Sequence, residues 1–367
     1  MENLIIFGGS FDPIHHGHLR MARYASLTLN ADVVFVPAAN PRWKEPTSSK
    51  EDRLNMLKIA LAEEGTGAYF VDDFEMNNGS RVNYTIDTIK HFQTKYKNRE
   101  FILLIGEDEA QSFPNWKDSK EIETLCHIVY IPRKGVDLDP KIISEYHMQR
   151  LPYEEAGDVS SRDIRTLRSL DLDPKVLEYI EEHNLYFIKT LLGMMTGERF
   201  LHSLSVAHLA NDIARRNQFP NPQEAYVAGL LHDLGKELSL SEQKYLVNKD
   251  FSEFKDYPDW CLHQFASVSL AISRFGIDNP NVLEAIKYHA TGKAHLSPLG
   301  KIIYSSDKIE PTRGYDSKWM IKKCLLNYYS GFLKVFEENM IYQKEKGLSI
   351  DNPLTKECSK LYLGEIK

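Results

Sequence analysis

The sequence predicts two domains of different class: a doubly wound α/β domain with a parallel sheet, followed by an all-helical domain. Short apolar runs that end at glycine or proline recur from the start of the chain to about residue 131. From about residue 187 onward the apolar residues follow helical spacing, and no further strand–glycine unit occurs. A length of 367 residues also exceeds what one ordinary core fills. We therefore expect domains at residues 1–188 and 189–367.

Composition and charge restrict the partners. Hydrophobic residues make up 42% and charged residues 26% of the chain, which is typical of a globular protein. The net charge of −7 argues against nucleic acid as a partner, so nucleotide ligands should be small molecules. No leader-like segment or long apolar run is present, so we expect no membrane association and a cytoplasmic location. The oligomeric state stays open, a homo-oligomer included.

The first element is a strand over Leu4–Phe7 that ends at Gly8-Gly9. Glycines let the backbone turn sharply and bring its N–H groups close to a phosphate. Asp12-Pro13 continues the loop, and a helix is predicted to begin near His16. A strand, a glycine turn and a helix N-terminus together form an anion site. We therefore expect the imidazoles of residues 15–18 to lie beside nucleotide phosphates.

The stretch GGSFDPIHHGH resembles the GG(S/T)FDPxHxGH signature of the nucleotidylyltransferase superfamily. In that family the two HxGH histidines, here His15 and His18, hold the phosphates of ATP while the α-phosphoryl group is attacked. His16 falls at the variable place. The resemblance also implies nucleotide contacts from the turn itself, at Gly8, Gly9, Ser10 and Phe11.

A second strand is predicted over Val33–Val36, and the loop after it should face the glycine turn, because ligands of open α/β sheets bind beyond the carboxyl ends of the strands. This loop resembles the VPxxxPPHK loop of adenylyltransferases for nicotinate mononucleotide. It has Arg42-Trp43 where that family often has Pro-His. The resemblance implies that Lys44 binds phosphate during catalysis.

Helices and strands alternate through the middle of the first half. We predict a helix over Glu51–Leu61, a strand over Ala68–Phe74 and a helix that opens within Asn83–Ile89. The last of these resembles the SYTIDTL segment of the nicotinate-nucleotide branch. The resemblance implies that Thr85 and Asp87 lie beside the substrate, although both could be plain helix caps.

The clearest buried strand is Phe101–Ile105. The segment that follows it matches the family's GxDxxxxLxxW, with Phe113 in place of leucine. The resemblance implies that Gly106 and Asp108 contact the nucleotide and that Trp116 stacks on the nicotinate ring. Without it, a tryptophan at this place would be assigned to the core.

Two further segments complete the predicted site. A strand over Ile128–Ile131 places Arg133 at its carboxyl end. The segment Asp158–Arg165 resembles the family's ISSTxIR, with Arg162 in place of threonine. Serine hydroxyls and an arginine on a short helix suit triphosphate oxygens. Ser161 and Arg165 are therefore assigned to the nucleotide, with a plain capping serine as the alternative.

The chemistry of the first half follows from charge. A phosphate oxygen of nicotinate mononucleotide is already ionised, so no general base is required. Catalysis then consists of aligning two anions and neutralising charge, for which we expect His15, His18, Lys44, Arg165 and the Mg²⁺ carried by ATP. Phosphopantetheine and flavin adenylyltransferases use the same HxGH and remain alternatives.

The second half contains a spaced set of metal-ligand residues. Imidazole and carboxylate together suit Fe, Mn or Zn. Six ligands are more than one open catalytic ion needs, so we expect two divalent ions with one bridging aspartate, Asp233. The predicted ligands are His202, His232, Asp233, His263, His289 and Asp307.

The stretches AGLLHDLGKE, HATG and KIIYSSDKIEPTR resemble the HD hydrolase superfamily, and within it the bacterial symmetrical bis(5'-nucleosyl)-tetraphosphatases. The resemblance implies cleavage of diadenosine tetraphosphate into two ADP by a metal-bound hydroxide, with iron as the usual metal. It assigns catalytic roles to Asp233 and Lys236 and a phosphate contact to Arg313. A deoxynucleotide triphosphohydrolase, a cyclic-dinucleotide phosphodiesterase and a non-catalytic nucleotide sensor remain alternatives.

Overall fold

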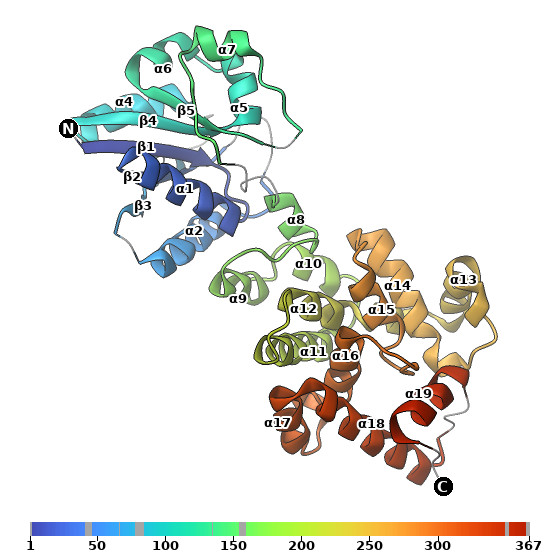
Figure 1. The fold of residues 1–367 in the computed structure, drawn as a ribbon. Coiled ribbons are helices and arrows are strands. Elements are labelled where there is room, and N and C mark those ends of the chain that lie inside the picture. The colour runs from blue at the N-terminus through green and yellow to red at the C-terminus, as the bar shows by residue number, and fades with distance from the viewer. Residues whose placement is uncertain are drawn as a thin grey trace. The chain divides into compact units, whose positions relative to one another are not determined.

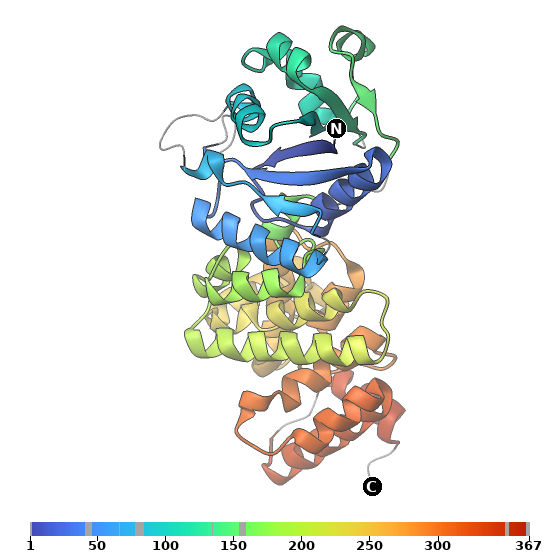
Figure 2. The ribbon, with the colours of Figure 1, turned by 90° about the vertical axis from the view of Figure 1, so that its left-hand side faces the viewer.

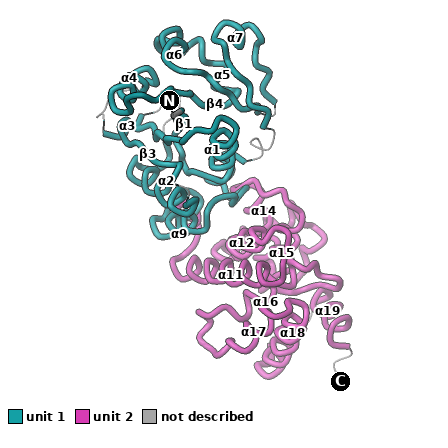
Figure 3. Tube along the Cα trace, turned by 60° about the vertical axis from the view of Figure 1, so that its left-hand side comes forward, with its two compact units in different colours: residues 1–188 teal, residues 189–367 magenta. Residues whose placement is uncertain are grey.

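The computed structural model describes residues 2–40, 46–65, 67–77, 84–133, 135–153, 159–348 and 352–364. The chain divides into two compact units, Met1–Ile188 (unit 1) and Lys189–Lys367 (unit 2), shown in Figure 3. In these ranges the helices are all too short or too polar to cross a bilayer.

Unit 1 is built on a parallel sheet of six strands in the order β3-β2-β1-β4-β5-β6 (Figure 1). This order confirms the predicted doubly wound α/β class. The order reverses between β1 and β4, and ligands of such sheets bind beyond the carboxyl ends of the strands at that reversal. The strands are β1 (Glu2–Gly9), β2 (Ala31–Pro37), β3 (Tyr69–Val71), β4 (Arg99–Gly106), β5 (His127–Ile131) and β6 (Gln149–Arg150).

Helices cover both faces of this sheet, and Figure 2 shows α2 and α4 on opposite sides of it. The strands are therefore apolar along their whole length rather than alternately apolar and polar. The helices are α1 (His16–Leu29), α2 (Lys50–Glu64), α3 (Phe74–Asn77), α4 (Thr85–Lys95), α5 (Glu107–Ser112), α6 (Ser119–Leu125), α7 (Pro140–Glu145), α8 (Ser161–Arg165), α9 (Pro174–Glu182) and α10 (Phe187–Leu192), the last of which contains the unit boundary.

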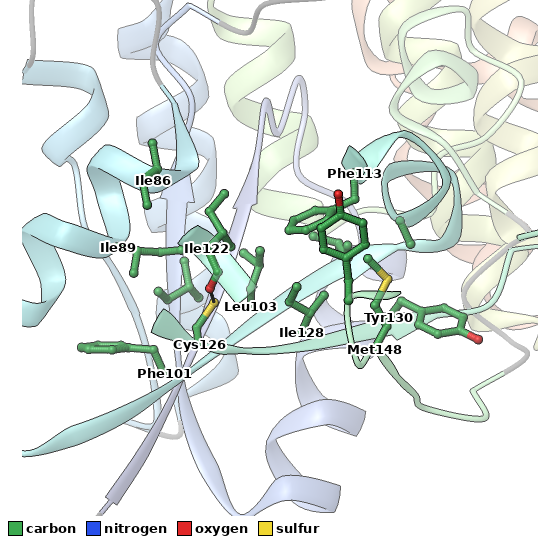
Figure 4. Close-up of a cluster of buried hydrophobic side chains, with 14 of the residues drawn as sticks. Ile86, Ile89, Phe101, Leu103, Phe113, Ile122, Cys126, Ile128, Tyr130 and Met148 are labelled. Carbon is green, nitrogen blue, oxygen red and sulfur yellow. Dashed lines mark hydrogen bonds between the residues drawn. The ribbon is translucent and has the colours of Figure 1, made fainter. Parts of the chain in front are cut away.

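Strand β4 contributes buried side chains to both faces of the sheet. Leu103 and Ile105 join the cluster that contains Ile89 of α4 and Ile122 of α6 (Figure 4). Leu104, between them on the strand, is equally buried but points to the opposite face. Each such buried side chain contributes about 1.5–3 kcal/mol to folding. The carboxyl end of β4 is thus fixed from both sides.

The predicted strand over Ala68–Phe74 is too long. Strand β3 ends at Val71, because Asp72 uses its carboxylate to accept the backbone N–H of Phe74 at 3.0 Å and so starts helix α3. The same carboxylate is 2.6 Å from Lys95 Nζ. A buried aspartate with these partners ends the strand.

Unit 2 consists of helices wherever the structure describes it, which confirms the predicted helical class. Helices α11 and α12 pack side by side (Figure 2). A Cβ on Gly229 would lie 2.7 Å from the backbone of Ala207, so glycine is required for this close approach. The helices are α11 (Gly197–Arg216), α12 (Pro222–Leu231), α13 (Leu240–Asp250), α14 (Leu262–Phe275), α15 (Pro280–Lys287), α16 (Pro298–Ile309), α17 (Lys318–Leu326), α18 (Tyr328–Glu345) and α19 (Pro353–Leu363).

Candidate functional site

Hydrogen bonds from a buried arginine hold the turn after β1. Arg53 of α2 is 1% exposed and donates hydrogen bonds to the carbonyls of Ser10, Ala38 and Ala39 at 2.9, 2.6 and 3.1 Å. These carbonyls belong to the loops after β1 and β2, so one guanidinium ties the two loops together. Planar guanidinium groups suit such multiple, fixed hydrogen bonds.

Asp12 fixes the next part of the turn. Its carboxylate accepts hydrogen bonds from the backbone N–H of Thr47 at 2.8 Å and the hydroxyl of Tyr186 at 2.8 Å. Although burial raises the pKa of Asp12, these bonds, those from Ser48 and the charge of Arg165 together hold that pKa below its usual value. Asp12 is therefore an ionised structural anchor of the loop that leads into α1.

His15 and His18 lie together at the start of α1. Their ring centroids are 3.7 Å apart. A Cβ on Gly17 would lie 2.9 Å from His15 Nδ1, so the glycine of HxGH makes room for the His15 ring. His15 is 4% exposed, and its Nδ1 has no hydrogen-bond partner within the described ranges. A buried polar atom in this state suits a ligand.

The backbone fixes the tautomer of His18. The backbone N–H of His15 donates to His18 Nδ1 at 3.3 Å, so Nδ1 carries the lone pair and Nε2 the proton. Burial and the charge of Arg133 lower the pKa of His18 to about 3, and burial also lowers the pKa of His15. His18 is thus a neutral N–H donor in the free protein.

A cavity of ≈370 Å³ lies beyond the carboxyl ends of β1, β4 and β5. Its lining includes imidazoles, hydroxyls, glycine backbone and two arginines, Arg133 and Arg162, which suit phosphate oxygens. Arg133 is held in place by Asp108, with Nη1 2.8 Å from Oδ2. The predicted residues that the structure brings together here are Gly8, Gly9, Ser10, Phe11, His15, His18, Gly106, Asp108, Arg133 and Ser161.

A second cavity of ≈290 Å³ shares the Gly8–Ser10 turn with the first. Its walls include Trp116, Thr85 and the apolar side chains of Leu103 and Ile105. Trp116 also packs against the core, so the core and ligand-platform interpretations of this residue are compatible. An indole and aliphatic walls suit an aromatic ring. The glycine turn therefore lies between a polar and an apolar half of one site.

Among the described residues, the predicted Asp87 and Arg165 are not part of either cavity lining. Asp87 lies 3.9 Å from Lys117 Nζ. Arg165 donates to the backbone carbonyl of Asp12 at 2.6 Å, so in this structure it supports the turn. Lys44 falls outside the described residues. The nucleotide contacts of these three residues stay predictions.

Two acids of the second cavity were absent from the predicted set. Glu75 and Glu109 line the ≈290 Å³ cavity, and burial raises the pKa of each to about 7. Glu109 accepts the backbone N–H of Gly106 at 3.1 Å. The three-residue spacing from Gly106 to Glu109 is a capping signal that could have identified Glu109. No sequence signal marks Glu75, whose burial depends on the packing of α3.

In unit 2 the six predicted metal ligands converge from separate elements. Their ligand atoms form three groups, each within 4.8 Å: His202, His232 and Asp233; His232, His289 and Asp307; and Asp233, His263 and His289. The ligands come from α11, the end of α12, α14, the end of α15 and α16. Their action as ligands stays a prediction, but they share one buried centre.

Asp233 lies between two pairs of histidines. Its Oδ1 is 3.5 Å from His263 Nε2 and 3.3 Å from His289 Nε2. Its Oδ2 is 3.6 Å from His232 Nε2 and 3.9 Å from His202 Nε2. One oxygen faces each pair, which is the arrangement that a bridging carboxylate needs.

The four imidazoles are oriented as metal ligands require. His232, His263 and His289 each direct Nδ1 to the backbone carbonyl three residues earlier, at 2.7, 3.0 and 2.8 Å. His202 Nδ1 is 3.0 Å from Glu310 Oε1. Carbonyl and carboxylate oxygens only accept, so Nδ1 carries the proton and each Nε2 presents a lone pair to the centre.

The Nε2 atoms that face the centre indicate whether these residues fit a metal ion. The buried Nε2 atoms of His202 and His232 have no hydrogen-bond partner within the described ranges. An unpaired buried lone pair is unfavourable unless something accepts it. Divalent cations that favour nitrogen and carboxylate ligands do so. The residues therefore fit a divalent metal.

A short 3₁₀ helix, η3 (Leu234–Glu237), connects Asp233 to the rest of the site. A Cβ on Gly235 would lie 2.6 Å from the carbonyl of His263, so this glycine permits η3 to pack on α14. The N–H of Gly235 donates to Ser267 Oγ at 2.8 Å. Predicted Lys236 follows, with Nζ 3.5 Å from His263 Nδ1, and burial lowers its pKa.

Cations surround the two aspartates of the centre. Arg199 Nη1 donates to Asp233 Oδ2 at 2.6 Å. Lys308 Nζ is 2.6 Å from Asp307 Oδ2, and the predicted Arg313 pairs with the other oxygen of Asp307. Arg199 and Lys308 were absent from the predicted set. Arg199 precedes a ligand by one helical turn on α11, and this spacing could have identified it.

The chain is similar to two known protein families, one in each unit. The family model described as cytidylyltransferase-like matches residues 6–167, and the HD domain model matches residues 199–312. The HD match and the His/Asp groups together indicate a divalent-metal centre. A protein of Mycoplasma genitalium named "probable nicotinate-nucleotide adenylyltransferase/Ap4A hydrolase" is 33% identical over 317 residues, 85% of this chain and 88% of the relative.

Two further similarities extend this comparison. A protein of Mycoplasma pneumoniae with the same name is 32% identical over 316 residues, 85% of this chain and 90% of the relative. A crystal structure from Clostridium acetobutylicum, described as a predicted HD superfamily hydrolase involved in NAD metabolism, is 28% identical. It covers 48% of this chain and 94% of its own, with a TM-score of 0.44.

The His18 geometry predicts a titration that nuclear magnetic resonance can follow. Because its pKa lies at about 3, the ring of the free protein stays neutral, as the Nε2–H tautomer, while the pH falls through about 6.5, where an unfolded histidine titrates. In that window unfolding takes up a proton, so the His18 contribution to stability declines as the pH falls. Ring ¹⁵N shifts of the folded and urea-unfolded chain measure this; a folded-state midpoint near 6.5 contradicts it.

Because Glu310 contacts Nδ1 of His202, we expect Glu310 to affect metal affinity through that histidine. It is 1% exposed; although burial raises its pKa, hydrogen bonds that include one from His202 hold that pKa at about 2. Glu310→Gln removes the charge that orients His202, so metal affinity should fall about 10–100-fold, as measured by competition with a chelator. Glu337→Gln, which alters an exposed surface pair with Lys334, is the matched control. Equal affinity in the wild type and Glu310→Gln contradicts this role.

Proposed function

The chain belongs to the nicotinate-nucleotide adenylyltransferase/Ap4A hydrolase family, and from this premise we propose that unit 1 carries the transferase and unit 2 the hydrolase. Unit 1 transfers AMP from ATP to nicotinate mononucleotide, giving nicotinate adenine dinucleotide and pyrophosphate, a step of NAD biosynthesis. Unit 2 hydrolyses diadenosine tetraphosphate (Ap4A) to two ADP. The four cysteines are buried free thiols, which agrees with a cytoplasmic, reducing location.

The observation that carries the transferase assignment is the pair of cavities on either side of the Gly8–Ser10 turn. A phosphate oxygen of the mononucleotide attacks the α-phosphorus of ATP, and the bond to the β-phosphate oxygen breaks to release pyrophosphate. With the triphosphate beside His18 and the pyridine ring beside Trp116, the two reacting phosphates meet at the turn. Holding them there supplies the entropic part of catalysis.

Neutral donors and fixed cations supply the electrostatic part. His18 Nδ1 accepts a hydrogen bond from the backbone N–H of His15, so the neutral ring presents Nε2–H to a phosphate oxygen. Arg133, fixed by Asp108, adds a full positive charge. Donors that are already oriented need no reorganisation as charge develops on the departing pyrophosphate. Mg²⁺ arrives with ATP as part of the substrate.

For unit 2 the supporting observation is the set of Nε2 lone pairs that converge on Asp233. His202, His232 and Asp307 would hold one divalent ion, His263 and His289 the other, with Asp233 shared. Bound ions supply Lewis-acid chemistry and lower the pKa of water. We propose iron as the metal, as the resemblance to the tetraphosphatases implies, and the imidazole and carboxylate ligands suit iron as they also suit Mn and Zn.

The chain's own cations bind the polyphosphate in this proposal. Arg199, Lys236, Lys308 and Arg313 surround the centre. Charge-assisted hydrogen bonds from such groups are the strongest that phosphate oxygens accept. Cations on both the Asp233 side and the Asp307 side suit a substrate with phosphates on both sides of the cleaved bond. When water attacks one of the two central phosphorus atoms and the central P–O–P bond breaks, one ADP is left on each side.

Single substitutions in each unit test the division of labour. His18→Ala removes one oriented donor, so kcat/KM for adenylyl transfer should fall about 10²–10³-fold while Ap4A hydrolysis persists. His232→Ala should strip metal and hydrolysis while adenylyl transfer persists. Both rates and the elemental metal content are measured for each full-length variant. Loss of both activities from either substitution contradicts the assignment.

Product analysis tests the substrates. With ATP and each of nicotinate mononucleotide, phosphopantetheine and flavin mononucleotide, pyrophosphate should form rapidly only with the first. The metal-loaded protein should convert Ap4A into ADP alone, without AMP or ATP. Formation of AMP and ATP would exclude symmetrical cleavage. Hydrolysis of deoxynucleoside triphosphates or cyclic dinucleotides in place of Ap4A would assign unit 2 to another HD activity.

A further inference from the structure

A buried glutamine in unit 2 connects the backbone beside two of the predicted metal ligands. Gln264 of α14 directly follows His263 in the chain and is 0% exposed. Its side-chain oxygen accepts the backbone N–H groups of Ala290 and Thr291 at 3.2 and 3.3 Å. Ala290 in turn directly follows His289. One amide group therefore joins the chain next to one ligand to the chain next to another.

The hydrogen bonds fix the orientation of this amide group. Two backbone N–H groups need an acceptor, so the side-chain atom that faces them is the oxygen of Gln264. Its Nε2 then donates to the hydroxyl of Thr291 at 3.2 Å, and that hydroxyl donates to the carbonyl of Gly292 at 2.9 Å. A side chain without an amide at position 264 would deprive both N–H groups of this acceptor, which is unfavourable in a protein interior.

Helix α19 holds the same segment through a different group. The hydroxyl of Thr355 donates to the carbonyl of Thr291 at 2.9 Å, and Asn352 Nδ2 donates to that hydroxyl at 2.9 Å. A Cβ on Gly292 would lie 2.8 Å from Cys358 Sγ of α19, so glycine permits this close approach. Thr291 is thus held through its N–H and hydroxyl by α14 and through its carbonyl by α19.

These contacts reach one half of the centre. His263 Nε2 and His289 Nε2 lie 3.3 Å apart, and both face Oδ1 of Asp233. In the part of the chain that the structure describes, the side-chain hydrogen bonds of Gln264 go to residues 290 and 291 alone. The ligands assigned to the other ion come from α11, the end of α12 and α16. A change at Gln264 should therefore affect one ion and spare the other.

We infer that Gln264 is a positioning residue of the metal centre, which holds His263 and His289 at the separation that one ion requires, and that Thr355 of α19 supports it. The inference rests on the proposed hydrolase function of unit 2. Gln264 acts through the two histidines and does not itself ligate the ion. Ligands that are already in place lose less conformational freedom when the ion binds, so affinity depends on such outer contacts.

The test measures the binding of Mn²⁺ to the full-length protein rather than hydrolysis. The protein is stripped with a chelator and titrated with Mn²⁺, and electron paramagnetic resonance measures the free ion. The wild type should bind two ions per chain. In Gln264→Met, which keeps a side chain of similar length but lacks the amide, one of the two sites weakens about tenfold and the other keeps its affinity.

A second amide side chain of unit 2 provides the matched control. Asn217 Nδ2 donates to the carbonyl of Cys324 at 3.0 Å, and its oxygen accepts the N–H of Tyr328 at 3.0 Å. Asn217 thus makes the same kinds of hydrogen bond, but it joins the end of α11 to α17 and α18 rather than one ligand segment to another. Asn217→Leu should leave both Mn²⁺ affinities as in the wild type.

A pair of substitutions in α19 tests the support from that helix. Thr355→Val removes the hydroxyl that bonds to the Thr291 carbonyl and keeps the shape of the side chain. It should weaken the same Mn²⁺ site as Gln264→Met, by a smaller factor, whereas Thr355→Ser keeps the hydroxyl and the wild-type affinity. If Gln264→Met gives poor soluble yield, this pair decides the inference.

The outcomes are distinguishable. Two unchanged Mn²⁺ affinities in Gln264→Met overturn the inference and leave the proposed function intact. Equal weakening of both sites, or the same loss at one site in Asn217→Leu, assigns Gln264 a general structural role and also overturns the inference. A wild type that binds fewer than two ions when Mn²⁺, Fe²⁺ and Zn²⁺ are each offered overturns the two-ion centre of the proposed function itself.

Discussion

Hydrogen bonds with the backbone set the proton position of one imidazole in unit 1 and of three in unit 2, and the chemistry of both units depends on this constraint. In unit 1 a main-chain N–H donates to His18 Nδ1, so the ring presents Nε2–H. In unit 2 main-chain carbonyls accept from Nδ1 of His232, His263 and His289, so each ring presents a lone pair. The same side chain is therefore a donor to phosphate in one unit and a ligand for a cation in the other. Burial keeps His18 and His263 neutral by lowering their pKa values.

Close packing at glycines makes these hydrogen bonds possible. Gly17 lets the His15 ring fold over the start of α1, where a Cβ would lie 2.9 Å from His15 Nδ1. Gly235 lets η3 pack on α14 beside His263, where a Cβ would lie 2.6 Å from a backbone oxygen. Neither glycine has a positive φ. Both are required by space rather than by backbone conformation, so their place in HxGH and HDLGK has a physical reason.

The features that could be predicted from the sequence are those that a local pattern of residues encodes. The strands over Leu4–Phe7 and Phe101–Ile105 were recognisable because both faces of a parallel sheet are buried. The metal-type residues were recognisable because His232-Asp233 and its spaced partners recur on apolar helices. Glu310 was missed, since its role depends on which side chain packs beside it in the fold, and Arg199 was missed although it lies one helical turn before His202. Arg165 illustrates the limit: its type suits phosphate, yet in the structure it donates to the backbone of Asp12.

Cationic neighbours compensate the burial of Asp233 and Asp307, the two aspartates of the centre in unit 2. Burial alone raises the pKa of Asp233 and Asp307, yet both pKa values lie well below the usual range, and at Asp307 the charges of Lys308 and Arg313 favour the ionised form. A buried carboxylate without such partners would take up a proton and lose its capacity to bind a cation. Arg199 on Asp233 supplies the same compensation on the other side. The chain thus balances the charge of its buried carboxylates with cations of its own.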